Sequence, residues 1–200
     1  MARASSKPRL ERIKSAETQY PRTKYRQALG PLLRETNDRC GYSLQHVLDL
    51  GRKSMEVDHF NPTLRHPFRN RHGNLIAASR HCNGAKGEFW PNAEDRKDGL
   101  YLINPYEEQD YGKHIGEDRK TGRLVGRTHT GKWHIEILDL NADHLVQKRR
   151  DRTRLQNTFL ATALASGTDS TDGMIREVFA KLAEAQASML PVMIPELPAA

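Results

Sequence analysis

The side chains best suited to catalysis lie in the middle of the chain. Asp58 and His59 are adjacent. Hydrolysis of a phosphodiester needs a metal that polarises the phosphate, a base that activates water, and positive charge around the anion. A carboxylate such as Asp58 is a hard oxygen donor suited to Mg²⁺ or Mn²⁺, and the imidazole of His59 can accept a proton from water near neutral pH. The pair therefore indicates metal-assisted hydrolysis, with His59 as general base.

Two strands and one helix are expected to position these residues. Residues 55–60 alternate loosely in polarity and end at Asn61-Pro62, which predicts a strand and a turn, and residues 74–78 form a second short strand. Ser79 can cap a helix from residue 80 to about 89, although two glycines weaken it. The expected order is strand, loop, strand, helix.

Asp58 and His59 can serve one site only if the first strand ends or twists beside them, because adjacent strand residues point to opposite faces. Asn74 opens the second strand, and Asn83 lies near the helix N-terminus, a position that favours phosphate. The hairpin and the helix would thus bring three polar clusters together.

Four motifs together resemble the HNH endonuclease family. They are Cys40-Gly-Tyr-Ser, Glu56-Val-Asp-His-Phe-Asn-Pro62, Asn74-Leu-Ile and His81-Cys-Asn-Gly-Ala-Lys-Gly87. That family folds as a ββα-metal module. The resemblance implies catalytic roles for His59, Asn74 and Asn83: His59 as general base, Asn74 shaping the loop between the strands, and Asn83 with Asp58 as ligands of one divalent cation, Mg²⁺ or else Mn²⁺. Asn83 replaces the usual histidine, but an amide oxygen still ligates a hard cation.

The charge balance favours a nucleic-acid partner. Lys and Arg number 32 against 25 Asp and Glu, giving a net charge of +7. We expect Lys86, Arg80 and Arg71 to contact phosphates, with a solvated helix lysine as the alternative for Lys86. DNA is favoured over RNA, since an aromatic content of 6% argues against extensive base stacking on a single strand. The competing hypotheses are a non-cleaving nucleic-acid-binding or partner module on the same fold, and an RNA-directed nuclease.

A wider resemblance covers about residues 38 to 155. The segments Gly87-Glu-Phe-Trp-Pro91, Leu102-Ile-Asn-Pro105 and Ile135-Glu-Ile-Leu-Asp-Leu-Asn141 are similar to bacterial HNH proteins of phage-defence systems, such as the Septu-type nuclease component. Such nucleases often work beside an ATPase. The sequence has no Gly-rich phosphate loop, so any ATPase would be a separate protein.

The two cysteines are the remnants of a pattern found in many HNH proteins. Family members often carry two Cys-x-x-Cys pairs that bind structural zinc, whereas Cys40-Gly-Tyr-Ser43 and Ser79-Arg-His-Cys82 retain one thiol each. A mixed site with His46 or His81 is one alternative. We expect instead no structural Zn²⁺, with Cys40 and Cys82 packed as small hydrophobes.

The resulting fold class is α+β, a ββα-metal (HNH) core with a small appended β-sheet and flanking helices. Four segments are predicted: a basic N-terminal arm and helix (1–37), the HNH module (38–92), an appended β segment (93–141), and C-terminal helices with a tail (142–200). The helix of the first segment is expected at about 24–37. The strands of the third segment are expected at 100–103, 123–125 and 133–138, and the helices of the last at 142–165 and 171–190. The longest apolar runs are too short to span a bilayer, and the N-terminus lacks an apolar signal core, so we expect a cytoplasmic protein.

Overall fold

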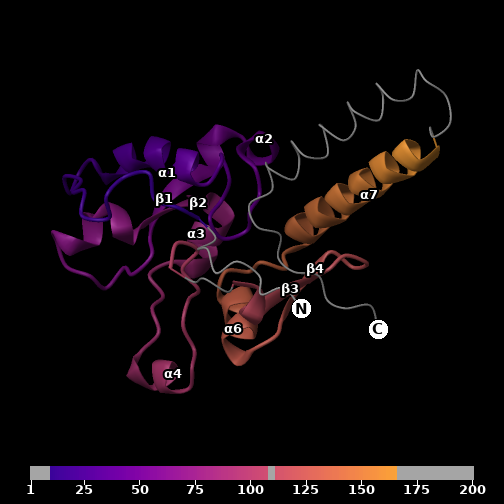
Figure 1. Ribbon diagram of the computed structural model, residues 1–200. Helices are drawn as coiled ribbons and strands as arrows, with labels where there is room; N and C mark the ends of the chain where they lie inside the picture. Colours follow the sequence, from indigo (N-terminus) through magenta and orange to yellow (C-terminus); the bar gives the residue numbers. More distant parts are fainter. Residues whose placement is uncertain (1–9, 108–110, 166–200) are drawn as a thin grey trace.

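The computed structural model describes residues 10–107 and 111–165 (Figure 1). Within these ranges the chain is a mixed α+β protein, in which helices surround two small antiparallel sheets of two strands each. The predicted last helix (171–190) and the first nine residues of the basic arm lie outside the described residues.

The first sheet is a hairpin followed directly by a helix. Strand β1 (Met55–His59) pairs with β2 (Leu75–Ser79), so that Asp58 lies opposite Ile76, and α3 (Arg80–Lys86) begins at the next residue. The Ser79 side chain caps α3 by accepting a hydrogen bond from the Cys82 N–H at 3.2 Å. The helix ends earlier than residue 89 because Gly87 has a φ of +53°, which glycine adopts readily.

The segment before the hairpin is helical, as predicted, with a change of helix type inside it. A 3₁₀ turn, η1 (Tyr25–Ala28), leads into α1 (Leu29–Glu35). Pro31 lies in the first turn of α1, where its missing N–H costs no intrahelical hydrogen bond. Helix α1 buries Leu32 and Leu33 in the core.

Short helical turns connect these elements. They are α2 (Val47–Leu50), η2 (Arg52–Ser54), η3 (Phe68–Asn70), η4 (His72–Asn74), α4 (Ala93–Lys97) and α5 (Tyr111–His114). Turns η3 and η4 occupy the loop between β1 and β2, so Asn74 ends a 3₁₀ turn instead of opening the strand.

The second sheet pairs β3 (Ile115–Asp118) with β4 (Arg123–Gly126), which contains the predicted strand 123–125. Helices α6 (His129–Ile137) and α7 (Asp143–Ala165) follow. Helix α7 matches the prediction of a helix from 142 to 165. The side chain of Asn141, two residues before α7, is bonded to the backbone N–H and C=O of Leu124 on β4.

The prediction of a strand at 133–138 was wrong, because α6 covers most of this segment. The apolar residues there alternate, which suggested a strand. The buried residues of α6, however, are Thr130, Gly131, His134 and Ile135, and Leu138 is buried directly after the helix. The last four of these are spaced at i, i+3, i+4 and i+7. Two of these four are not apolar side chains, so the helical periodicity was hidden in the sequence.

The prediction of a strand at 100–103 was also wrong, since these residues form no strand. Leu102 and Ile103 are buried as an interior strand would be. The Ile103 N–H, however, donates to Nδ1 of His134 at 3.1 Å instead of to a neighbouring strand. His134, on helix α6, thus supplies the hydrogen-bond acceptor that a neighbouring strand would supply in a sheet.

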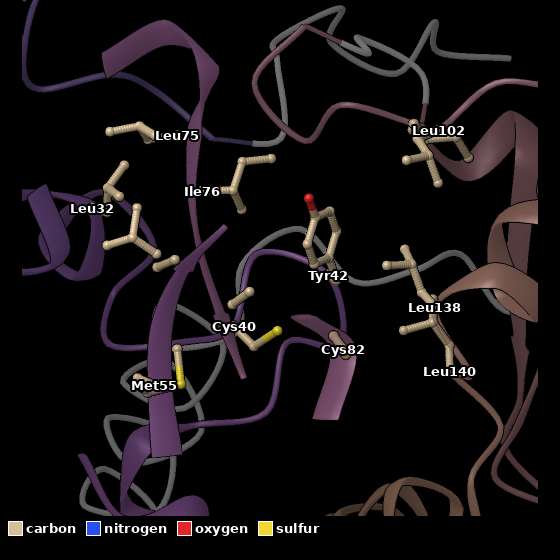
Figure 2. Packing of buried hydrophobic residues seen from close by; sticks show 14 of the residues in the cluster. Leu32, Cys40, Tyr42, Met55, Leu75, Ile76, Cys82, Leu102, Leu138 and Leu140 are labelled. Atoms are coloured by element: carbon tan, nitrogen blue, oxygen red, sulfur yellow. The ribbon is translucent and has the colours of Figure 1, made fainter. Parts of the chain in front are cut away.

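One hydrophobic cluster joins the hairpin to the parts on either side of it (Figure 2). Its members run from Ala28 to Leu140 and include Leu32, Tyr42, Ile76, Ile103, Ile115 and Leu138. The predicted segments 1–37, 38–92 and 93–141 therefore contribute to one shared core. None of the helices in the described part of the chain is both long and apolar enough to cross a membrane.

Candidate active site

A pocket of about 780 Å³ opens at the end of β1, where Asp58 and His59 lie. Its walls come from the hairpin, from the loop between the strands, from α3 and from the N-terminal segment. The lining residues used below are Arg22, Tyr25, Asp58, His59, Arg65, Arg69, Asn70, Asn83 and Glu88. Strand β1 ends at His59, as a shared Asp58–His59 site requires, and both residues line the pocket.

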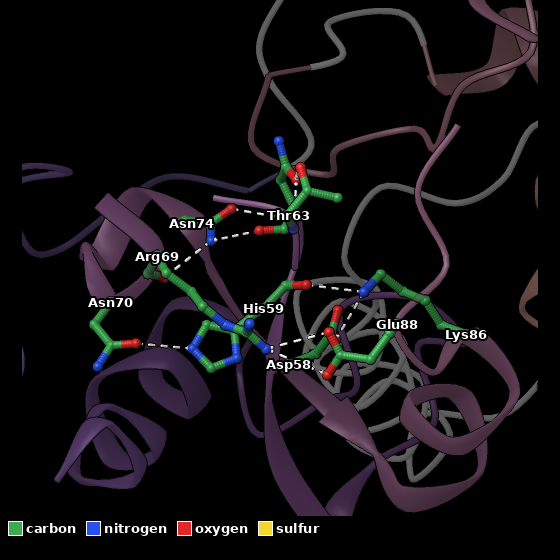
Figure 3. A network of polar contacts seen from close by, with 9 residues as sticks. Asp58, His59, Thr63, Arg69, Asn70, Asn74, Lys86 and Glu88 are labelled. Carbon is green, nitrogen blue, oxygen red and sulfur yellow. Dashed lines mark hydrogen bonds and ion pairs between the residues drawn. The ribbon is translucent and has the colours of Figure 1, made fainter. Parts of the chain in front are cut away.

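His59 is held by two neighbours, of which Asn70 is drawn in Figure 3. Its Nε2 lies 3.0 Å from Oδ1 of Asn70, and the Tyr25 ring lies 4.7 Å from the imidazole, centroid to centroid. Burial lowers the pKa of His59 below its ordinary 6.5, and the positive charge of Arg69 acts in the same direction. The imidazole is therefore neutral at pH 7, the state that a general base needs.

Asp58 is buried and accepts two hydrogen bonds. The Tyr42 hydroxyl donates to Oδ2 at 2.5 Å, and the Lys86 ammonium donates to Oδ1 at 3.0 Å. Lys86 also donates to the backbone oxygen of His59 at 2.8 Å and is only 2% exposed. The alternative of a solvated helix lysine was therefore wrong: the side chain turns inward because α3 packs against β1, where a buried carboxylate needs a counter-charge.

Asn83 extends from α3 towards the same pocket. Its Nδ2 donates to Glu56 at 2.7 Å, and Arg80 donates to the other Glu56 oxygen at 3.0 Å. Because the amide nitrogen of Asn83 is bonded to Glu56 on β1, the amide oxygen Oδ1 is the atom that could bind a cation.

The oxygens of Asp58 and Asn83 suit a hard cation that keeps most of its water ligands. Mg²⁺ commonly binds proteins through one or two carboxylates together with water and substrate phosphate. Each Asp58 oxygen has a second lone pair beyond the one engaged by Tyr42 or Lys86. Residues 10–107 and 111–165 hold no cluster of three or more His, Cys, Asp or Glu side chains placed to bind a metal. Because Lys86 already donates to Oδ1 of Asp58, any cation bound here would share this carboxylate with the ammonium group.

Asn74 lies behind the pocket and ties the loop together (Figure 3). Its Oδ1 accepts from the Asn61 N–H at 2.9 Å, while its Nδ2 donates to the backbone oxygens of Asn61 at 3.1 Å and Arg69 at 2.9 Å. These bonds join the start of the loop to its last turn. They fix the backbone that carries Arg69.

The cations that line the pocket are Arg22, Arg65 and Arg69, which the sequence analysis did not single out. Arg69 is paired with Glu88 at 3.2 Å across the pocket. For Arg22, Arg65 and Arg69, the sequence indicated a binding role only through the general excess of arginine in the arm and the loop. The two arginines that were singled out do not line this pocket: Arg71 pairs with Glu17 at 2.6 Å, and Arg80 is bonded to Glu56.

Cys40 and Cys82 are buried and lie next to each other (Figure 2). Ser43 and Ser79 interact with both of them. Cys40 Sγ accepts from the N–H groups of Ser43 at 3.4 Å and Ser79 at 3.2 Å. Burial opposes ionisation of Cys40, but hydrogen bonds from Cys82, Ser43 and Ser79 lower its pKa to about 5. Treating both thiols as small hydrophobes was therefore incomplete, because Cys40 is a hydrogen-bond acceptor.

The two histidines considered for a mixed zinc site have other partners. His46 accepts from the Leu48 N–H at 3.1 Å, and His81 contacts the backbone oxygen of Asp139 at 3.1 Å. The region between Cys40 and Cys82 contains a hydrogen-bonded group of two thiols and two serines.

No protein-family model matches the chain, and comparison with curated proteins finds no significant match.

Proposed function

We propose that this chain is a metal-dependent endonuclease of the HNH type that hydrolyses phosphodiester bonds in DNA. On this proposal, β1, β2 and α3 are the ββα-metal core. The observation that carries the proposal is the meeting of Asp58, His59 and Asn83 at one pocket that also contains Arg22, Arg65 and Arg69. A neutral imidazole, two oxygen donors and three guanidinium groups are the components that phosphodiester hydrolysis requires.

In the proposed reaction His59 removes a proton from the attacking water. Because Nε2 is engaged by Asn70, the proton is accepted at Nδ1. Asp58 and Asn83 would hold a divalent cation, Mg²⁺ or Mn²⁺, which polarises the phosphate and stabilises the leaving oxygen. Arg65 and the arm residue Arg22 bind the substrate backbone without reading its sequence.

A plasmid-nicking assay tests this proposal. Supercoiled DNA is incubated with the protein and Mg²⁺ or Mn²⁺, with EDTA as the metal-free control. Nicking should require the metal and should fall at least about 100-fold in His59→Ala, since a general base typically contributes 10²–10⁴-fold. Asn83→Ala should fall as well. The exposed residues His129 and Asn157 provide matched controls, His129→Ala and Asn157→Ala, which should cleave like wild type. Equal cleavage by wild type and both site variants would refute the proposal.

One observation favours a second candidate, a nucleic-acid-binding module that does not cleave. Lys86 already supplies Asp58 with a positive charge, so the buried carboxylate is neutralised without a metal. Metal-independent binding of DNA or RNA, measured by fluorescence anisotropy, together with no cleavage in any metal, would support this candidate. Using DNA and RNA duplexes of the same sequence also separates a DNA nuclease from an RNA-directed one.

The similarity to phage-defence nucleases adds a cellular proposal. We propose that the chain acts in antiphage defence, beside an ATPase encoded as a separate protein. Plaque assays on bacteria that express the chain with and without its neighbouring genes test this, and His59→Ala should abolish protection.

A further inference from the structure

The N-terminal segment reaches the candidate active site by a short series of backbone contacts. Residues 15–22, called the N-terminal strap below, run along the loop that precedes β2. The Gly73 N–H donates to Ala16 O at 2.9 Å, the His72 N–H donates to Thr18 O at 2.8 Å, and the Tyr20 N–H donates to Asn70 O at 3.1 Å. The strap therefore fixes the backbone at Asn70.

The strap also determines how the Asn70 amide is oriented. Asn70 is 4% exposed, and its Nδ2 faces the backbone oxygens of Tyr20 and Pro21, each at 3.4 Å. The opposite orientation would place Oδ1 against two acceptors. The amide oxygen must therefore point the other way, towards Nε2 of His59 at 3.0 Å.

An amide oxygen can only accept, so Nε2 of the neutral imidazole must carry the proton. The other ring nitrogen, Nδ1, then holds the lone pair. The Tyr25 ring, 4.7 Å from the imidazole and tilted by 45°, limits rotation of the ring out of this arrangement.

We infer that Asn70, held by the N-terminal strap, is a positioning residue that sets the tautomer and orientation of His59. Its role in catalysis rests on the proposed nuclease function, whereas its effect on the tautomer does not. The inference assigns a function to the strap, which the sequence analysis treated only as part of a basic arm. It also adds to the site a residue that acts through its hydrogen bond to His59.

The test measures the tautomer directly. Long-range ¹H–¹⁵N correlation spectra of the whole ¹⁵N-labelled chain at pH 8 distinguish the two neutral tautomers, and a His59→Gln variant assigns the signals. Asn70→Leu removes the acceptor at similar size. It should shift the tautomer ratio of His59 away from the Nε2–H form by about 2- to 12-fold, the equivalent of one hydrogen bond. Asn157→Leu, at an exposed site on α7, should leave the His59 signals in place.

Asn70→Asp provides a second measurement. It retains an oxygen acceptor at the same position, so the same spectra should still show the Nε2–H tautomer of His59. If Asn70→Leu leaves the tautomer ratio of His59 unchanged, or if Asn70→Asp does not keep the Nε2–H form, the inference is overturned, whether or not the protein cleaves DNA.

Cleavage kinetics then separate this inference from the proposed function. If wild type nicks DNA, Asn70→Leu should lower kcat about 10- to 100-fold, the range seen when an outer-shell partner of a functional histidine is removed. KM should stay nearly unchanged. A normal kcat despite a shifted tautomer would overturn the catalytic role of Asn70. Absence of wild-type cleavage would refute the nuclease proposal, while the NMR result would still decide the inference.

Discussion

The ion pair between Lys86 and Asp58 should contribute strongly to stability, and the chain contains a natural control for it. Lys148 pairs with Asp49 at the same N–O distance, 3.0 Å. The side chains of the first pair are 0% and 4% exposed, whereas those of the second are 47% and 42% exposed. The two pairs thus have the same chemistry and distance and differ in burial.

Coulomb's law gives the scale of the difference. At 3.0 Å two unit charges attract by about 1.4 kcal/mol in water, and by about 5–6 kcal/mol at the effective dielectric constant of about 20 typical of proteins. Desolvation offsets much of the second figure. Removing one partner of a buried pair nevertheless costs about 3–5 kcal/mol, because the other charge is left unpaired. An exposed pair contributes about 0–1 kcal/mol.

We therefore expect Lys86→Met to lower the free energy of unfolding by about 3–5 kcal/mol, and Lys148→Met by less than about 1 kcal/mol. Urea titrations followed by circular dichroism measure both values. For a chain of 200 residues the corresponding decrease in Tm is roughly 6–20 °C for Lys86→Met. Adding Asp58→Asn to Lys86→Met should recover part of the loss, because it removes the unpaired charge. Similar small losses in both single variants would show that the buried pair does not form.

Four further results are expected. In Lys86→Met, Mg²⁺ should raise Tm more than in wild type, because the freed Asp58 carboxylate no longer shares its oxygens with an ammonium; an equal Mg²⁺ effect in both proteins would contradict the ligand assignment. Cleavage should rise as pH increases, with the midpoint of kcat/KM below pH 6.5, since burial lowers the pKa of His59 and the base must be neutral; a midpoint above 6.5 would contradict this. Arg65→Ala should reduce the slope of log affinity against log salt by about 1 in DNA-binding titrations, whereas Arg154→Ala, on the exposed side of α7, should not. Burial opposes ionisation of Glu35, but hydrogen bonds, the strongest from His72, lower its pKa below 4.5. The ionised carboxylate therefore stabilises the fold above pH 4.5, and this stabilisation is lost as the pH falls through the lowered pKa. The stability of Glu35→Gln should accordingly depend less on pH than that of wild type in an acid titration.

The local elements around the site could be predicted because their signals are local. Alternation in β1 and the Ser79 cap lie within a few residues of the features they determine, whereas the end of α3 was expected at about residue 89 and lies at Lys86. The errors arose where long-range contacts decide the structure. The backbone N–H of Ile103 donates to His134, far along the chain, and not to a neighbouring strand. Helix α6 buries a glycine and a histidine, so its helical pattern is not visible as a pattern of apolar residues. The secondary structure of residues 100–103 and 133–138 could therefore not be read from those residues alone.

The same distinction applies to the candidate site. Asp58, His59 and Asn83 belong to recognisable motifs, and they do line one pocket. Asn70 and Arg22 belong to no motif and reach the pocket only through contacts between distant parts of the chain. The inward turn of Lys86 could not be predicted either, because it depends on how α3 packs against β1.

The N-terminal strap has a consequence for the order of folding. Tyr20 meets His72 across 52 residues, and the other strap contacts span similar separations, whereas the hairpin and α3 are formed by near neighbours in the sequence. Closing long loops is entropically costly before other contacts compensate for it, so local elements form earlier. The strap, although synthesised before the hairpin, should therefore dock after it. His59 would receive its final orientation in this last step, so an incompletely folded chain would contain the pocket residues without an aligned base.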